Sequence, residues 1–179
     1  MTGQINVNKI AARTGNTITV NSGDKISGAA GSIVAPGQVI QTTQQVYTTQ
    51  TNITATSFTS TGLTTSITPT STSSKILALV HLSVEVYQNA SSGYSVVYEI
   101  KRDSTQIAKK YTNCYAGVAG NAYYVIPMDG TMIFLDSPNT TSSTTYSVNA
   151  YLTSSANSFT MRLNNQTGTS SLTLQEIAQ

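Results

Sequence analysis

Apolar residues alternate strictly with other residues along one stretch of this chain, between residues 75 and 87. Every even-numbered position of the stretch is apolar: Ile76, Ala78, Val80, Leu82, Val84 and Val86. Successive side chains of a β-strand point to opposite faces, so this period of two predicts a strand whose even-numbered face lies in a core. The odd-numbered face changes from apolar to polar: Leu77, Leu79, His81, Ser83 and Glu85. We expect that face to be covered in part by a partner subunit, or by a loop or the N-terminal segment of the same chain.

Further strand patterns follow at nearly even spacing up to the C-terminus. They lie at residues 39–46, 94–101, 106–111, 123–128, 131–135, 145–152, 159–163 and 172–177. Turn patterns separate them, for example residues 59–62 between Phe58 and Leu63, and Asp103-Ser104. Helical periodicity of useful length is missing. About eight strands with turns every 8–12 residues predict an all-β protein built as a jelly-roll β-sandwich.

The composition agrees with an ordered β protein. Ser and Thr make up 53 of the 179 residues, and charged residues only 9%, against about a quarter in an average domain. Thr is β-branched and packs well on a pleated sheet. Such a polar chain could also be disordered, but 39% of it is apolar and alternates in register. We therefore expect a folded protein with a hydroxyl-rich surface, extracellular or exposed on a particle.

Two regions are expected, with a boundary near Pro36-Gly37. Residues 1–36 carry short β patterns split by turns, with too few apolar residues to close a core in one chain. We interpret them as an anchor and stalk shared between several chains. Residues 27–32 (SGAAGS) form a flexible joint in this interpretation. Residues 37–179 are expected to form the jelly-roll head.

Charge and hydropathy argue against several classes of partner. The net charge is +2, and the densest basic stretch, Lys101-Arg102 with Lys109-Lys110, is interrupted by Asp103. Nucleic-acid binding usually rests on a basic stripe, so none is expected. No apolar run reaches transmembrane length, and the first residues lack the basic and apolar regions of a secretory signal. The chain is expected to be made in the host cytoplasm and to leave the cell inside an assembled particle.

Residues for catalysis are sparse. His81 is the single histidine and shares a predicted strand face with Ser83 and Glu85. A catalytic triad needs residues from different elements, and zinc needs three or four good ligands. We therefore expect His81 to be a hydrogen-bonded residue at a subunit contact. Cys114 is the single cysteine, which excludes an intrachain disulfide, and a small buried thiol is expected.

Paired carboxylates for glycoside hydrolysis also receive little support. Three of the seven acidic residues, Asp103, Asp129 and Asp136, lie in turn patterns and are expected to cap turns. The prediction is a protein that is not an enzyme, with no catalytic residue, no metal and no cofactor.

Several segments resemble a known family. The stretches TGLTTSITPTSTSSKIL (61–77), FLDSPNTTSSTTY (134–146) and LTLQEIAQ (172–179) are similar to the distal domain of fibre and tail proteins of marine bacteriophages. NTITVNSG (16–23) and PGQVIQ (36–41) are similar to segments that precede such domains. The resemblance implies a homotrimer whose C-terminal part is a jelly roll like those of tumour-necrosis-factor and complement globular-head domains. It brings no catalytic residues.

Tyrosine is the abundant aromatic residue, with ten copies against three Phe and no Trp. Tyr joins apolar area to a polar tip, which suits interfaces. We expect a Gly- and Tyr-rich loop, from about Asn113 to Asn121, to be the contact surface; a tight connection packed at the trimer axis is equally compatible with its composition. The candidate contact residues are Tyr111, Asn113, Tyr115, Asn121, Tyr123 and Tyr124.

The function expected from these observations is that of a bacteriophage virion protein. The leading hypothesis is a homotrimeric short fibre or spike. Its head contacts a glycan or protein of the host surface, and its N-terminal region binds other virion proteins. The alternative is a capsid decoration or head-fibre protein that sits on the shell or reinforces it.

Overall fold

The computed structural model describes residues 22–23, 34–89, 92–116 and 124–179. The anchor and joint predicted within residues 1–36 therefore lie almost entirely outside the described residues. The described part forms twelve strand segments: β1 (Val39–Tyr47), β2 (Thr51–Ile53), β3 (Thr59–Ile67), β4 (Lys75–His81), β5 (Ser83–Gln88), β6 (Ser92–Arg102), β7 (Thr105–Ala116), β8 (Tyr124–Asp129), β9 (Met132–Asp136), β10 (Thr144–Leu152), β11 (Thr160–Leu163) and β12 (Ser170–Ile177). Two short 3-10 turns, η1 (Ala156–Ser158) and η2 (Asn165–Thr167), flank β11.

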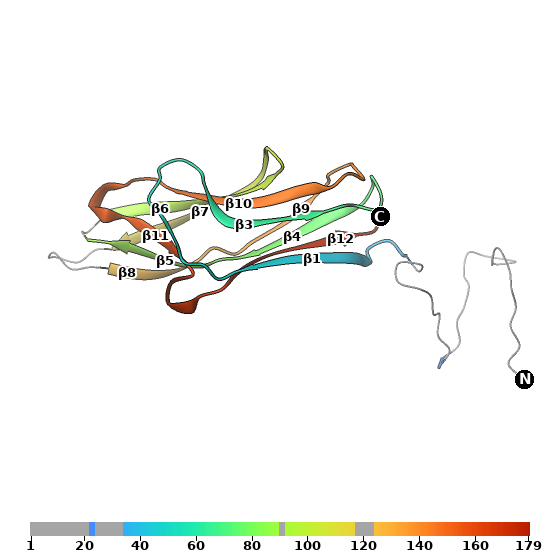
Figure 1. Cartoon of the computed structure of the whole chain (residues 1–179), viewed down its shortest axis with the longest axis horizontal. Coiled ribbons are helices and arrows are strands. Elements are labelled where there is room, and N and C mark those ends of the chain that lie inside the picture. Colours follow the sequence, from blue (N-terminus) through green and yellow to red (C-terminus); the bar gives the residue numbers. More distant parts are fainter. Residues whose placement is uncertain (1–21, 24–33, 90–91, 117–123) are drawn as a thin grey trace, which may run out of the picture. The chain divides into compact units, whose positions relative to one another are not determined.

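The strands form a jelly roll, which confirms the predicted fold class. Three antiparallel sheets have the orders β1-β12-β4-β9, β2-β11-β5-β8 and β3-β10-β6-β7. The first two run in the same order because their members are consecutive pieces of long strands: β1 with β2, β12 with β11, β4 with β5, and β9 with β8. Counted as eight long strands, the orders are 1-8-3-6 and 2-7-4-5, the two four-stranded layers of a jelly roll. Figure 1 shows β3, β6 and β10 in one layer and β1, β4 and β12 in the other.

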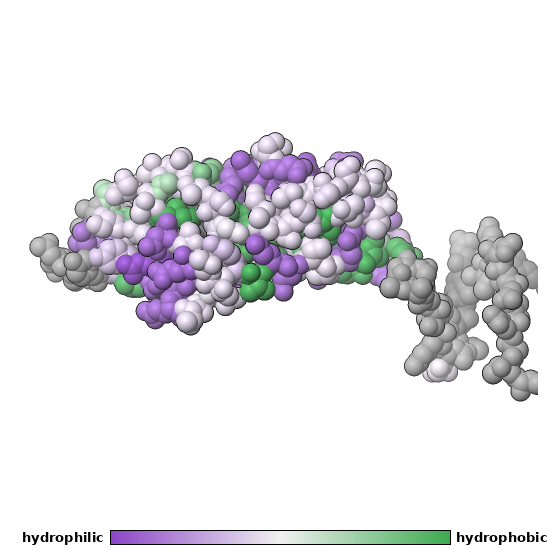
Figure 2. Space-filling view, in the orientation of Figure 1, coloured by the Kyte–Doolittle hydropathy of each residue, from purple (hydrophilic) through white to green (hydrophobic). Residues whose placement is uncertain are grey.

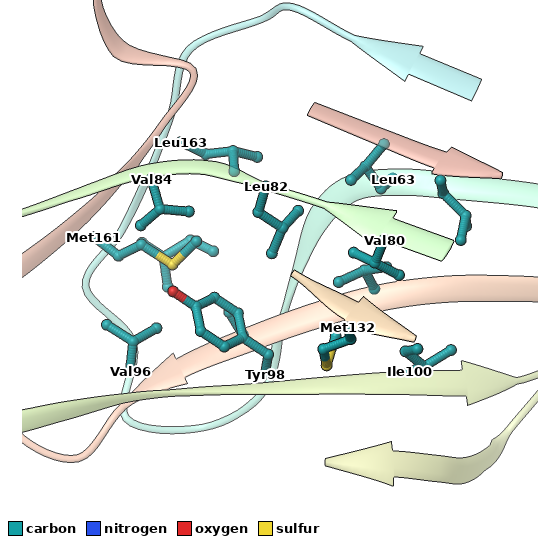
Figure 3. Close-up of a cluster of buried hydrophobic side chains, with 14 of the residues drawn as sticks. Leu63, Val80, Leu82, Val84, Val96, Tyr98, Ile100, Met132, Met161 and Leu163 are labelled. Atoms are coloured by element: carbon teal, nitrogen blue, oxygen red, sulfur yellow. The ribbon is translucent and has the colours of Figure 1, made fainter. Parts of the chain in front are cut away.

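The core between the layers has the register that the alternating residues predict. All six even-numbered side chains from Ile76 to Val86 are at most 6% exposed. They meet buried side chains from the opposite layer, among them Leu63, Tyr98 and Ile100 (Figure 3). The surface outside is mostly pale on the hydropathy scale (Figure 2), as expected where Ser and Thr replace charged residues.

The predicted single strand over residues 75–87 is interrupted at Leu82. β4 pairs with β12 and β9, whereas β5 pairs with β11 and β8. Leu82 stays in the core and is 1% exposed. Gly130, in the β8–β9 connection, packs directly against it, because a Cβ on this glycine would lie 2.7 Å from Leu82 Cβ. The strands of the long layer are therefore interrupted between the two sheets, while the even-numbered face from Ile76 to Val86 stays buried throughout.

The turn predicted at residues 59–62 is wrong, because β3 runs through it. Gly62 has a φ of +88°, and the register of β3 against β10 shifts beside it, between Ser147 and Asn149. Two extra residues of β3 at this point make a β-bulge, and glycine accommodates the positive φ there. The turn composition thus marked an irregularity within a strand, and not its end.

A partly buried ion pair joins the two layers. Arg102 Nη1, at the end of β6, lies 2.9 Å from both carboxylate oxygens of Asp136 at the end of β9. Tyr146 on β10 donates a hydrogen bond of 2.7 Å to Asp136 Oδ2, and burial together with this contact raises the pKa of the Tyr146 hydroxyl. Asp136 therefore does not cap a turn as predicted. Asp103 lies in the β6–β7 turn with a φ of +50°, and its Oδ1 accepts a hydrogen bond of 3.0 Å from the Thr145 amide on β10, which joins the turn to the neighbouring strand.

Candidate interaction surfaces

The predicted contact residues are divided between two strands. Strand β7 extends to Ala116, so Asn113, predicted to begin a loop, lies within a strand. Tyr111, Asn113 and Tyr115 alternate along this strand and are exposed on one face, with exposed fractions of 56% for Tyr111 and 79% for Tyr115. Tyr124 is the first residue of β8 and is half-buried. Asn121 and Tyr123 lie outside the described residues. Tyr111, Asn113 and Tyr115 thus share the outer face of the β3-β10-β6-β7 sheet.

Aromatic rings surround one ammonium group on this outer face. Lys109 Nζ lies 4.9 Å from the ring centroid of Tyr111, 5.8 Å from that of Phe58 and 6.0 Å from that of Tyr151. Phe58 and Tyr151 meet edge to face at 4.8 Å. Rings attract cations through their electron-rich faces, and the contact with Tyr111 raises the pKa of Lys109 and lowers that of Tyr111. We call Phe58, Lys109, Tyr111 and Tyr151 the aromatic cluster.

Sequence reasoning missed most members of this cluster. Tyr151 lies opposite Val97, and Val97 lies opposite Tyr111, so the two tyrosines flank one residue of the central strand β6. Alternation marks both tyrosines as outward-facing in their own strands. Only the order of the strands brings them together.

A second surface is apolar and lies on the outer face of the β1-β12-β4-β9 sheet. Leu77 and Leu79 of β4 are paired with Leu135 and Ile133 of β9. Ile133 is 68% exposed and Leu135 is 54% exposed, while the two leucines of β4 are half-buried. The positions that continue the face across β12 and β1 are polar: Thr173, Gln175, Thr42 and Gln44. Leu77, Leu79, Ile133 and Leu135 therefore form a bounded apolar area, which we call the β4/β9 patch.

A groove of about 480 Å³ runs beside this patch. It lies between β7 and β9, which are the edge strands of their two sheets, and its lining consists of residues 107–110 and 131–134. Lys110 Nζ spans it with a hydrogen bond of 3.0 Å to the Thr131 carbonyl. Ile133 belongs to both the lining and the patch, so two differently oriented apolar surfaces meet along β9.

Residues considered for catalysis or metal binding do not come together in the described part of the chain. His81 is exposed beyond the β4/β9 patch, and the carboxylate of Glu85 is bonded to Arg162 and Asn165 instead. Cys114 is 4% exposed, and burial raises the pKa of its thiol, so it is the small buried thiol that was expected. Among the described residues, three or more His, Cys, Asp or Glu side chains nowhere cluster as metal ligands would. Within the same residues, no helix has the length and apolar character needed to cross a membrane.

Comparison with known proteins gives weak structural similarities. No family model matches the chain, and no curated protein matches its sequence. Among solved structures, the Gx strain of infectious bursal disease virus is similar over 87% of this chain and 47% of that chain, at 11% identity and a TM-score of 0.28. The VP2 subviral particle of the same virus is similar over 87% and 42%, at 12% identity and a TM-score of 0.28. This chain thus spans less than half the length of the proteins it matches, and at such TM-scores the likeness by itself assigns no function.

Proposed function

We propose that this chain is a non-enzymatic bacteriophage virion protein that forms a homotrimeric short fibre or spike. Residues 37–179 are its distal head and contact the host surface, while the N-terminal region binds other virion proteins. The observation that carries the proposal is the β4/β9 patch, an apolar area that the described part of the chain leaves exposed on a protein with a hydroxyl-rich surface. The resemblance to phage fibre domains supports the same assignment.

The position of this patch supports self-association. Contacts between two different surfaces of identical subunits are heterologous and can close into a ring. The β4/β9 patch and the neighbouring groove provide two such surfaces along β9. Ile133 and Leu135 are more than half exposed, and covering each is expected to contribute about 1–2 kcal/mol at every subunit contact.

The outer face of β7 is the proposed contact with the host. Tyr111, Asn113 and Tyr115 present two exposed rings and an amide in a row. Rings with polar tips bind by stacking and by hydrogen bonds at a low entropy cost. The β4/β9 patch belongs to the other layer, and the groove is lined by residues 107–110 of β7 and not by Tyr111, Asn113 or Tyr115, so these three side chains stay outside the proposed subunit contact.

The oligomeric state provides the direct test. Light scattering on the full chain should give about three times the chain mass of 18.9 kDa. Leu135→Lys places a charge in the patch and should yield monomers, whereas Gln44→Lys, on the same sheet face outside the patch, should leave the trimer intact. A folded wild-type monomer would refute the proposed trimer. Labelling the protein in electron micrographs of particles separates a few copies at a tail from the many copies that a capsid decoration protein would show.

A further inference from the structure

A small polar pocket opens on the outer face of the β2-β11-β5-β8 sheet, on the long layer of the sandwich. It has a volume of about 150 Å³ and is lined by Ser83, Val84, Glu85, Pro127 and Asn165. Strand pairing places Glu85 on β5 between Arg162 on β11 and Pro127 on β8. Pro127 is exposed on the edge strand β8, so one wall of the pocket is an accessible apolar ring.

The carboxylate of Glu85 is fixed in position from one side. Its Oε1 accepts hydrogen bonds from Asn165 Nδ2 at 2.5 Å and from Arg162 Nη1 at 3.3 Å. The guanidinium of Arg162 in turn lies 4.5 Å from the ring centroid of Tyr87. Both donors to Glu85 in the described part of the chain use Oε1. Oε2 therefore keeps its acceptor capacity, in a pocket that Asn165 and Ser83 also line.

The loop that carries Asn165 is held in an unusual conformation. Asn164, Gln166 and Thr167 have φ angles of +55°, +50° and +67°, which non-glycine residues seldom adopt, and β-branched residues least of all. Such strain persists only where surrounding contacts enforce it, and it concentrates at binding and catalytic sites.

Those enforcing contacts come mainly from one buried side chain. Asn164 is 2% exposed. Its Nδ2 donates hydrogen bonds to the carbonyls of Tyr47 and Thr49, at 2.9 and 3.2 Å. Its Oδ1 accepts a hydrogen bond of 2.6 Å from Ser170 Oγ. Gly168 then closes over Ser83, where a Cβ would overlap the hydroxyl oxygen. The loop is thus pre-organised to present Asn165 next to Glu85.

We propose that this pocket binds a neutral pyranose sugar. Its free polar atoms are chiefly acceptors, a carboxylate oxygen and an amide oxygen beside one hydroxyl, which suits a ligand with adjacent hydroxyl donors. Pro127 offers an apolar surface for the C–H face of the sugar ring. The carboxylate of Glu85 opposes an anionic ligand at the same position. The pocket is a second site, on the layer opposite the proposed host contact of β7, and the inference rests on the proposed function only for the source of the sugar.

Ligand-detected NMR on the full chain tests the proposal with methyl pyranosides of glucose, galactose and mannose, and with methyl glucuronide as the anionic comparison. At least one neutral glycoside should bind in the millimolar range or tighter. Glu85→Gln keeps the shape but removes the charge, and it should weaken binding about tenfold. Asn165→Ala should weaken binding as well, and Gln44→Ala, on the neighbouring sheet, should leave binding unchanged. Thermal melting of each variant checks that the fold is retained.

Three results would overturn the proposal. The first is that none of the three neutral glycosides binds. The second is that Glu85→Gln changes the affinity for the glycoside less than twofold. The third is that the glucuronide binds more tightly than the glucoside. None of these depends on the number of subunits. Failure of the sugar proposal is therefore distinguishable from failure of the trimer, which light scattering reports.

Discussion

The ion pair between Arg102 and Asp136 is expected to be a main attachment between the two layers of the sandwich. Asp136, on an edge strand of the long layer, is 7% exposed. It accepts hydrogen bonds from Arg102 and Tyr146, which both belong to the opposite layer. Asp136→Asn removes the charge and replaces one acceptor oxygen by a donor that faces other donors. The volume of the side chain hardly changes, so the effect reports on polar contacts alone.

The expected loss of stability follows from how far each partner is buried. Removing one member of a buried ion pair costs about 3–5 kcal/mol, because the other charge remains uncompensated. The side chain of Arg102 is 26% exposed, and water compensates part of its charge, which lowers the expected cost to about 2–4 kcal/mol. Tyr146→Phe removes only one hydrogen bond to a charged group and should cost about 1.5–3 kcal/mol.

Urea unfolding at one fixed protein concentration measures these changes. With a slope of about 1–3 kcal/mol per molar urea, Asp136→Asn should lower the midpoint by roughly 1 M or more. Asp103→Asn is the matched control: it is the same exchange at an exposed turn, and a change within about 0.5 kcal/mol is expected. If both Asp→Asn variants unfold at the same urea concentration, the ion pair does not hold the layers together.

Further substitutions test the register, the bulge and a buried acid. Val80→Asp buries an unpaired carboxylate and should abolish soluble protein in expression tests. Thr173→Asp, on the outer face of the same sheet, should be tolerated. The reverse outcome would mean that the strand register is shifted by one residue. Gly62→Ala should lower the melting temperature, since its φ is +88° and its Cβ would lie 2.5 Å from the Tyr47 ring. Burial raises the pKa of Glu176, but hydrogen bonds from Gln41 and Thr70 outweigh it and leave the pKa below the ordinary 4.5. The stability that the ionised Glu176 contributes is therefore present above about pH 4.5 and is lost as the pH falls through the lower pKa of the folded state. Between pH 7 and pH 3, the urea midpoint of the wild type should fall more than the midpoint of Glu176→Gln. Equal falls of the two midpoints would contradict this.

The sequence predicts the layers better than it predicts their irregularities. Alternation from Ile76 to Val86 depends only on which face is buried, so it identifies the core strand and its register. The break at Leu82 depends on a neighbouring glycine, Gly130, that lies far along the chain and leaves the alternation intact. Gly62 carries a real signal of positive φ, but the same signal fits a turn or a bulge, and only pairing with β10 decides between them.

For the candidate surfaces too, the sequence predicts what depends on a single strand and misses what depends on the order of the strands. Tyr111 and Tyr115 could be predicted as exposed contact residues from their own strand, because aromatic residues at alternate positions share a face. Tyr151 could not be joined to them, since its place depends on strand order. Asp136 was misassigned because the Leu-Asp-Ser-Pro pattern is local, whereas its partner Arg102 comes from another strand.

Different faces of one sandwich carry the interaction surfaces. The aromatic cluster lies on the β3-β10-β6-β7 layer, and the β4/β9 patch and the sugar pocket lie on two successive parts of the long layer. The break at Leu82 separates these two parts, so subunits that cover the patch on β4 need not cover Glu85 on β5. A charge placed at Leu135 should therefore dissociate subunits without changing the intrinsic affinity of each pocket for sugar. Coupling between the two would mean that a neighbouring subunit completes the pocket, and sugar binding would then be lost together with the trimer.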